Sequence, residues 1–119
     1  MPPHFSNKTP IFLQLADNIK SDIINGVYNP NEKLPSVRDF AFKYAINPNT
    51  VQKALQLLEE EGLIKTDSTN GKFVADNPVI IQSKKQKMIY DEVESFLKKM
   101  SKLGLNKNEI KQIINNIGE

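Results

Sequence analysis

Apolar residues recur at helical spacing in three segments of the chain before Gly62. The first segment opens at Thr9-Pro10, where a hydroxyl N-cap precedes a proline whose missing N–H is harmless in a first helical turn. Gly26 suits the end of this helix, because glycine readily adopts the left-handed conformation of a C-terminal cap. The apolar positions between them, which fall on one helical face, are Phe12, Leu15, Ala16, Ile19 and Ile23.

Two further helices are predicted on either side of a tight break. Ser36 is placed to cap the first of them, with Asp39 as its capping-box partner. Pro48 disfavours the helical conformation at the residue before it, so we expect Asn47 to cap the second helix, which Gly62 ends. The positions expected to be buried are Val37, Phe40, Ala41 and Tyr44 in the first helix and Val51, Ala54, Leu55 and Leu58 in the second.

Beyond Gly62 the pattern changes from helical to strand-like. Short runs at residues 63–67 and 72–75 flank Ser68-Thr69-Asn70-Gly71, and an Asn-Gly pair between two such runs is a strong signal for a β-hairpin. Three helices, a short turn between the second and third, and a hairpin predict a winged helix-turn-helix over residues 1–77. The expected fold class is therefore mainly α with a small β-hairpin.

Asp76-Asn77-Pro78 predicts a boundary, after which residues 78–119 carry two further amphipathic helices. Asn106 and Glu109 form a capping-box pattern at the start of the second of them. Two helices of this length bury little by themselves, so we expect a two-helix C-terminal dimerisation tail whose apolar stripes are covered by a second copy of the chain. Folding of the stripes onto the chain's own core is the alternative. The stripe residues are Ile89, Val93, Phe96, Leu97, Met100, Ile110, Ile113, Ile114 and Ile117.

The composition removes most catalytic and cofactor chemistry. The 119 residues contain no cysteine and one histidine, His4, so cysteine-ligated metals, disulfides and catalytic triads have no candidates. We therefore expect no cofactor, no metal site and no enzymatic activity. The longest apolar runs are three residues, far short of the roughly 20 that cross a bilayer, so no membrane span is expected. The first residues lack the pattern of a secretion signal, and a cytoplasmic location is the expectation.

The net charge of +2 does not by itself indicate a partner, because it is unevenly distributed. Residues 1–77 carry 8 basic and 9 acidic side chains, whereas residues 78–119 carry 8 and 5. Any case for nucleic acid therefore depends on where individual side chains lie.

Amide, hydroxyl and lysine side chains open the third predicted helix, without an acidic residue among them. Amides bond bidentately to adenine, lysine reaches guanine acceptors, and a helix-turn-helix presents the start of its second helix to the bases. These side chains are Asn49, Thr50, Gln52, Lys53 and Gln56. Taken alone, the same pattern also describes an ordinary solvated helix. The acidic run Glu59-Glu60-Glu61 opposes the dipole at the other end, and the sequence offers no reason for it.

Three more positions are candidates for contact with DNA. Arg38, the only arginine, falls in the first turn of the second predicted helix, where its forked guanidinium suits phosphate or guanine. A surface ion pair with Asp39 or another acid is the alternative. Gly71 is either a turn glycine or a bare backbone that approaches DNA closely, and Lys72 beside it is either a DNA contact or a solvated lysine.

Three motifs in a fixed order carry a resemblance to a known family. They are Leu34-Pro35-Ser36-Val37-Arg38, residues 45–54, and Leu58-Glu59-Glu60-Glu61-Gly62-Leu63-Ile64. The chain resembles the DNA-binding domain of GntR-family bacterial transcription regulators over roughly residues 10–75, and its short tail is similar to that of the YtrA-type subgroup. The resemblance implies a homodimeric regulator that binds a palindromic operator in double-stranded DNA, with repression the expected mode. It places the family's DNA contacts on Arg38, Asn49, Thr50, Gln52 and the wing at Gly71.

Two classes of function remain open from the sequence. The first is a sequence-specific DNA-binding regulator that dimerises through its tail. The second is a winged-helix protein-interaction module without sequence-specific DNA binding, which the excess of acids in residues 1–77 mildly favours. No motif specifies the operator sequence or a small-molecule effector.

Overall fold

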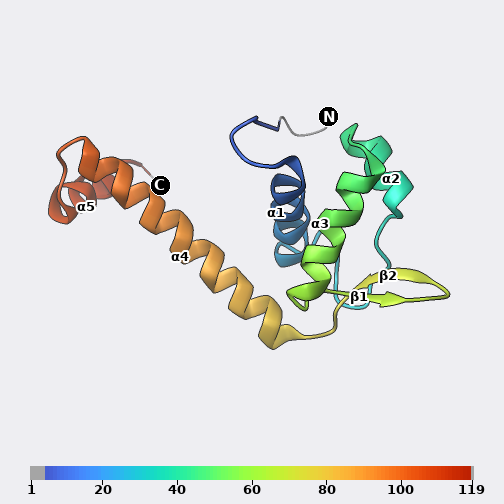
Figure 1. Ribbon diagram of the computed structural model, residues 1–119. Helices are drawn as coiled ribbons and strands as arrows, with labels where there is room; N and C mark the ends of the chain where they lie inside the picture. The colour runs from blue at the N-terminus through green and yellow to red at the C-terminus, as the bar shows by residue number, and fades with distance from the viewer. Residues whose placement is uncertain (1–4, 119) are drawn as a thin grey trace. The chain divides into compact units, whose positions relative to one another are not determined.

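The computed structural model describes residues 5–118, so the single histidine, His4, lies outside the described residues. The chain divides after Gln82 into two compact units. The first unit holds the first three helices, the hairpin and the start of α4, and the second unit holds the rest of α4 and α5. The elements are α1 (Ile11–Ile24), α2 (Val37–Tyr44), α3 (Pro48–Glu60), β1 (Ile64–Asp67), β2 (Gly71–Val74), α4 (Pro78–Lys102) and α5 (Lys107–Asn116) (Figure 1).

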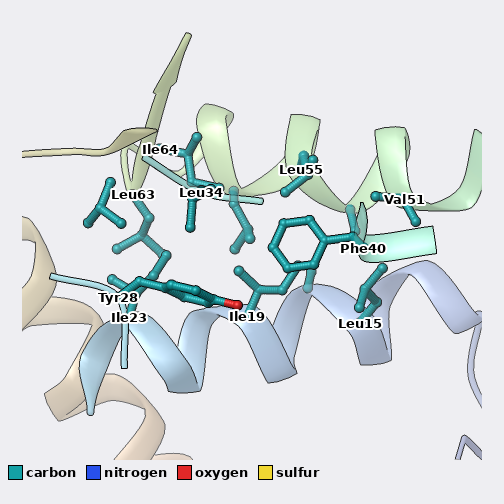
Figure 2. Close-up of a cluster of buried hydrophobic side chains, with 14 of the residues drawn as sticks. Leu15, Ile19, Ile23, Tyr28, Leu34, Phe40, Val51, Leu55, Leu63 and Ile64 are labelled. Carbon is teal, nitrogen blue, oxygen red and sulfur yellow. The ribbon is translucent and has the colours of Figure 1, made fainter. Parts of the chain in front are cut away.

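The apolar stripes of α1, α2 and α3 build the core of the first unit. α1 and α3 pack against each other, and the ring of Phe40 from α2 lies between them (Figure 2). Phe40 is fully buried, and the ring of Tyr28 meets it edge-on with 6.4 Å between the centroids. The predicted stripe of α1 is confirmed, with Phe12 half-buried at its edge. The buried residues of α3 are those predicted: Val51, Ala54, Leu55 and Leu58.

Capping interactions fix where α2 and α3 begin, at the predicted residues, although the Asp39 side chain does not return the second bond of the predicted capping box. Ser36 Oγ accepts the backbone N–H of Asp39 at 3.0 Å, and Asn47 Oδ1 accepts the backbone N–H of Asn49 at 2.7 Å. Pro48 occupies the first position of α3. Because each cap needs only a residue and its near neighbour, these starts could be read from the sequence.

The start of α1 differs from the prediction by one residue. Pro10, rather than Thr9, stands at the N-cap, and no side chain caps the helix. The carbonyl of Pro10 accepts the first backbone N–H groups of the helix, while the Gln14 amide donates to the carbonyls of Ser6 and Thr9. Thr9 was the wrong cap because Gln14 binds the segment before the helix and turns the chain at Pro10.

The predicted hairpin is confirmed, but its loop is one residue shorter than predicted. β1 and β2 pair antiparallel, with Ile64 opposite Val74 and Asp67 opposite Gly71. Gly71 therefore belongs to β2 instead of the turn, and the loop consists of residues 68–70. The Asp67 carboxylate explains this closure, because Oδ1 accepts the backbone N–H of Thr69 at 2.8 Å and that of Asn70 at 3.2 Å.

The segment before α2 adds backbone pairing to the free edge of β2. Val74 exchanges backbone hydrogen bonds with Asn31 and Glu32, and the N–H of Leu34 donates to the carbonyl of Lys72, all at 2.9 Å. The sequence predicts only a turn-rich connection here, because nothing in a local pattern names a strand's partner. A two-stranded hairpin is marginal alone, so this third segment stabilises it.

The second unit, which begins at Ser83, is a helical hairpin in which Ile110 of α5 packs beside Leu97 of α4. Ile110 is buried and lines a shallow hollow with Leu97 and Leu105. The predicted capping box is confirmed: Asn106 Oδ1 accepts the N–H of Glu109 at 2.9 Å, and Glu109 Oε1 accepts the N–H of Asn106 at 3.0 Å.

The other predicted stripe residues of this unit are not buried within it. Leu97 and Met100 are half-buried, and the exposed members are Ile89, Val93, Phe96, Ile113, Ile114 and Ile117. Ile117 was predicted to line the helical face, but α5 ends at Asn116 and the backbone of Ile117 is extended. Ile80 and Ile81, at the start of α4, pack against the core of the first unit instead.

The part of the chain that the structure describes contains neither a membrane-spanning helix nor a metal-binding cluster. No helix there has the length and apolar content needed to pass through a bilayer. No three or more His, Cys, Asp or Glu side chains gather there in a way that would hold a metal ion.

Candidate nucleic-acid interface

The outward face at the start of α3 carries the amide side chains predicted to contact bases. The Asn47 cap fixes this first turn, and Val51 faces the core. Asn49 and Gln52 are exposed, and Thr50 is half-buried at the flank. The carboxylates of α3 are confined to its C-terminal end. The amides therefore present donors and acceptors from a helix start that carries no negative charge, which is the chemistry of major-groove readout.

Lys53 lies on this face but points toward α1. Its Nζ stands 5.6 Å from the centroid of the Phe12 ring, a cation–π geometry. Contact between Lys53 and a base would require the ammonium to leave the ring. This contact could not be predicted from the sequence, because Phe12 and Lys53 are brought together only by the packing of α1 on α3.

Arg38 extends into solvent from the first turn of α2. The Ser36 cap fixes this turn, and Arg38 lines a shallow surface hollow with Pro35 and Phe42. Within residues 5–118 its guanidinium forms no ion pair with a carboxylate, so the pairing with Asp39 considered from the sequence is not formed. The guanidinium is therefore available to an external anion such as a phosphate.

The tip of the hairpin is organised by one carboxylate. The backbone N–H of Thr69, followed by the side chain and backbone N–H of Asn70, holds the pKa of Asp67 below its ordinary value. Gly71 follows with φ of +104°, a backbone conformation that residues other than glycine rarely adopt. A Cβ at this position would lie 3.4 Å from Lys33 Cε. The 3.4 Å approach is an ordinary van der Waals contact, so the positive φ alone favours glycine at this position in the free protein.

The order of this tip is expected to depend on pH in the acid range. Because the folded-state pKa of Asp67 is depressed, its stabilising bonds are complete above the ordinary aspartate value of about 3.9 and are lost as the pH falls through the folded-state pKa. Amide NMR shifts of Thr69 and Asn70 should therefore stay constant from neutral pH down to about 4 and move only below it. Asp67→Asn should abolish the transition, and titration at or above the ordinary value would contradict the geometry.

Two of the three carboxylates in the acidic run at the end of α3 pair with cations from other elements. Glu59 Oε1 lies 3.4 Å from the Nζ of Lys72 on β2, and Glu61 Oε1 lies 2.9 Å from the Nζ of Lys20 on α1. These pairs offset the unfavourable dipole at a helix C-terminus. Lys72, predicted as a DNA contact, is thus directed at α3 in the free protein.

Sequence reasoning missed two lysines beside the wing. The backbone of Lys33 bridges to Phe73, which brings its side chain against Gly71. Lys65 Nζ donates to Asn31 Oδ1 at 2.7 Å. Only the long-range pairing of the segment before α2 with β2 brings Lys33 to the wing, whereas Lys65 lies on β1, within a strand that the sequence predicted.

Comparison with known proteins places this geometry in a family. Residues 12–74, from the first turn of α1 to the end of β2, match the model of bacterial regulatory proteins of the gntR family. The chain belongs to the GntR family. The HTH-type transcriptional regulator YhcF of Bacillus subtilis (strain 168) is 36% identical over 110 residues, which are 92% of this GntR-family chain and 91% of that protein. The HTH-type transcriptional repressor YtrA of the same organism is 41% identical over 71 residues, 60% of this chain and 55% of that protein.

Solved structures agree with this assignment. A GntR family transcriptional regulator from Listeria monocytogenes matches with a TM-score of 0.88 and 33% identity over 96% of this chain and 100% of that chain. AraR(DBD) in complex with operator ORE1 matches with a TM-score of 0.56 and 28% identity over 63% of this chain and 93% of that chain. This GntR-family protein is therefore a DNA-binding transcription regulator of the YtrA-like subgroup with a winged helix-turn-helix fold. Its relatives are regulators and not enzymes.

Proposed function

We propose that this GntR-family protein is a homodimeric repressor that binds a palindromic operator in the cytoplasm. The observation that carries the proposal is the capped, amide-bearing start of α3, which is exposed and free of acids. Repression is supported by the relative YtrA of Bacillus subtilis, which is named a transcriptional repressor. A two-fold symmetric protein requires a two-fold symmetric site, and this symmetry leads to the palindrome.

Each DNA contact in the proposal follows from the position of its side chain. Asn49 and Gln52 contact base edges in the major groove, and Thr50 contacts phosphate or a thymine methyl group. Arg38 binds a phosphate beside the groove, because the helix before the recognition helix crosses the DNA backbone. Gly71 lets the wing approach DNA closely. Lys53 contributes only if its ammonium leaves the Phe12 ring.

The second unit supplies dimerisation in this proposal. Most of its exposed apolar residues lie on α4 and α5, and Ile110 is the buried residue among those described in this unit. Exposed apolar patches of this kind mark association surfaces, and a second copy covers the same residues on both partners of a two-fold dimer.

Selection of bound duplexes from random DNA tests the proposal most directly. The full chain is expected to enrich an inverted repeat with half-sites about one helical turn, roughly 10 base pairs, apart. Affinity for the selected duplex should fall steeply with salt, because phosphate contacts release counterions. Enrichment of no sequence, or of an unrepeated half-site alone, would contradict the palindromic operator and the dimer.

Arg38→Ala is expected to weaken binding to all duplexes about equally. Loss of one phosphate contact should lower the slope of log affinity against log salt by about 0.9. Titrations of a selected and an unrelated duplex at several salt concentrations measure both quantities. Lys43→Ala is the control, because it removes from the same helix a cation whose Nζ lies 5.3 Å from the centroid of the Tyr44 ring, and it should leave the slope unchanged. Loss of preference at a single base pair would reassign Arg38 to base readout.

A further inference from the structure

A polar cluster of three side chains joins α3 to both strands of the hairpin. The Thr66 hydroxyl donates to Glu59 Oε1 at 2.9 Å. Lys72 Nζ lies 2.9 Å from Thr66 Oγ1 and 3.4 Å from the same Glu59 oxygen. Thr66 and Lys72 are directly opposite in the register of the hairpin, and Glu59 is one residue from the C-terminal end of α3. The Glu59–Thr66–Lys72 cluster therefore links three elements of the first unit.

The cluster lies between the buried base of the hairpin and its exposed tip. Ile64 and Val74 anchor the base in the core, and residues 68–70 at the tip are exposed. The hairpin projects from the C-terminal end of α3 (Figure 1). The segment before α2 pairs with β2 only as far as Lys72. Beyond that point the ribbon is two-stranded and has little rigidity by itself, so the side-chain contacts at Lys72 and Thr66 bear on where the tip lies relative to α3.

Charge and exposure indicate what the cluster does. The side chain of Lys72 is 22% exposed and that of Glu59 is 41% exposed, so the ammonium is the more enclosed of the two. A carboxylate on the helix that enters the groove would repel phosphate, and at a helix C-terminus it also opposes the dipole. The contacts of Glu59 with Thr66 and Lys72 give both charges a structural use within the fold.

We propose that the Glu59–Thr66–Lys72 cluster sets the position of the wing relative to the recognition helix. Glu59 and Lys72 are then positioning residues for DNA binding, and Lys72 is not a DNA contact. The inference rests on the proposed function, because it assumes that α3 and the wing contact one duplex. It gives a prediction of distinctive sign: removal of the Glu59 charge weakens DNA binding, although a carboxylate near phosphate would ordinarily be unfavourable.

Five variants of the full chain separate the two roles on the duplex obtained by selection from random DNA. Glu59→Gln and Lys72→Met should each weaken binding about 3- to 10-fold, and the double variant should be no weaker than either, because both remove the same interaction. Lys72→Arg should retain the affinity. The salt slope should stay unchanged in all of them. Glu60→Gln is the matched control, since it removes the same charge from the neighbouring position and should not weaken binding.

Opposite results would overturn the inference. Tighter binding by Glu59→Gln, equal to that of Glu60→Gln, would show that the carboxylate only repels DNA. A salt slope lowered by about 0.9 in Lys72→Met would make Lys72 a phosphate contact.

A measurement without DNA keeps this inference distinct from the proposed function. Amide ¹⁵N relaxation at residues 68–70 should report larger motion in Glu59→Gln than in Glu60→Gln or the parent chain. Unchanged motion would overturn the positioning role even where DNA binding falls. If the parent chain selects no duplex, the proposed function fails, and the relaxation data still decide whether the cluster restrains the wing.

Discussion

Phe40→Ala is expected to lower the free energy of unfolding of the winged-helix unit by about 3–5 kcal/mol. The Phe40 ring is fully buried between α1 and α3, so truncation removes its apolar contacts and leaves a cavity. Domains of this kind are stable by only about 5–15 kcal/mol, so the loss is a large fraction of the total. Urea unfolding followed by circular dichroism measures the change, and DNA binding should fall in parallel because α2 and α3 lose their common support.

Phe42 provides a matched control on the same helix. Its side chain is 91% exposed, so Phe42→Ala makes the same chemical change without a core cavity. We expect a change in unfolding free energy within about 0.5 kcal/mol. Any gain in helix propensity from alanine applies to both variants and does not affect the comparison. Similar unfolding curves for the two variants would contradict the packing of Phe40.

Phe96→Asp is expected to convert the proposed dimer to a monomer and to weaken operator binding by about 10²- to 10⁴-fold. Phe96 lies on the exposed apolar stripe of α4, and a dimer that covers this stripe would bury the introduced carboxylate. A monomer holds one half-site at a time and loses the high effective concentration of the second winged-helix unit. Sedimentation equilibrium and DNA titration measure the two effects.

Ser95→Asp is the control for charge at the neighbouring position. Ser95 is exposed but does not belong to the stripe, so the same carboxylate should leave both the dimer and the affinity unchanged. A Phe96→Asp variant that remains dimeric would exclude the tail stripe as the interface. A parent chain that is monomeric at every concentration would contradict the homodimer itself.

Local interactions are the part of this fold that could be predicted. The caps at Ser36, Asn47 and Asn106 each depend on residues at most three positions apart, and each was predicted correctly. Helical stripes were also readable, because burial of one face imposes a period on the sequence. The prediction at Thr9 failed because Gln14, five residues away, holds the preceding segment.

For the candidate site, too, only the features that depend on local sequence could be predicted. The amides at the start of α3 and Arg38 were identified from their places on predicted helices, and the structure leaves Asn49, Gln52 and Arg38 exposed. The surroundings of Lys53 and Lys72 were not identified. Lys53 contacts Phe12 on α1, and Lys72 contacts Glu59 on α3. Contacts between residues so far apart in the chain cannot be predicted from a local sequence pattern.

The order of the elements, the residues facing the core and the amide-bearing start of α3 all follow from local sequence, because backbone capping and hydrophobic periodicity act between near neighbours. Tertiary structure alone decided that Glu59 meets Lys72, that Glu61 meets Lys20, and that the segment before α2 pairs with β2. Those contacts join segments far apart in the chain, and their geometry exists only after the core has packed.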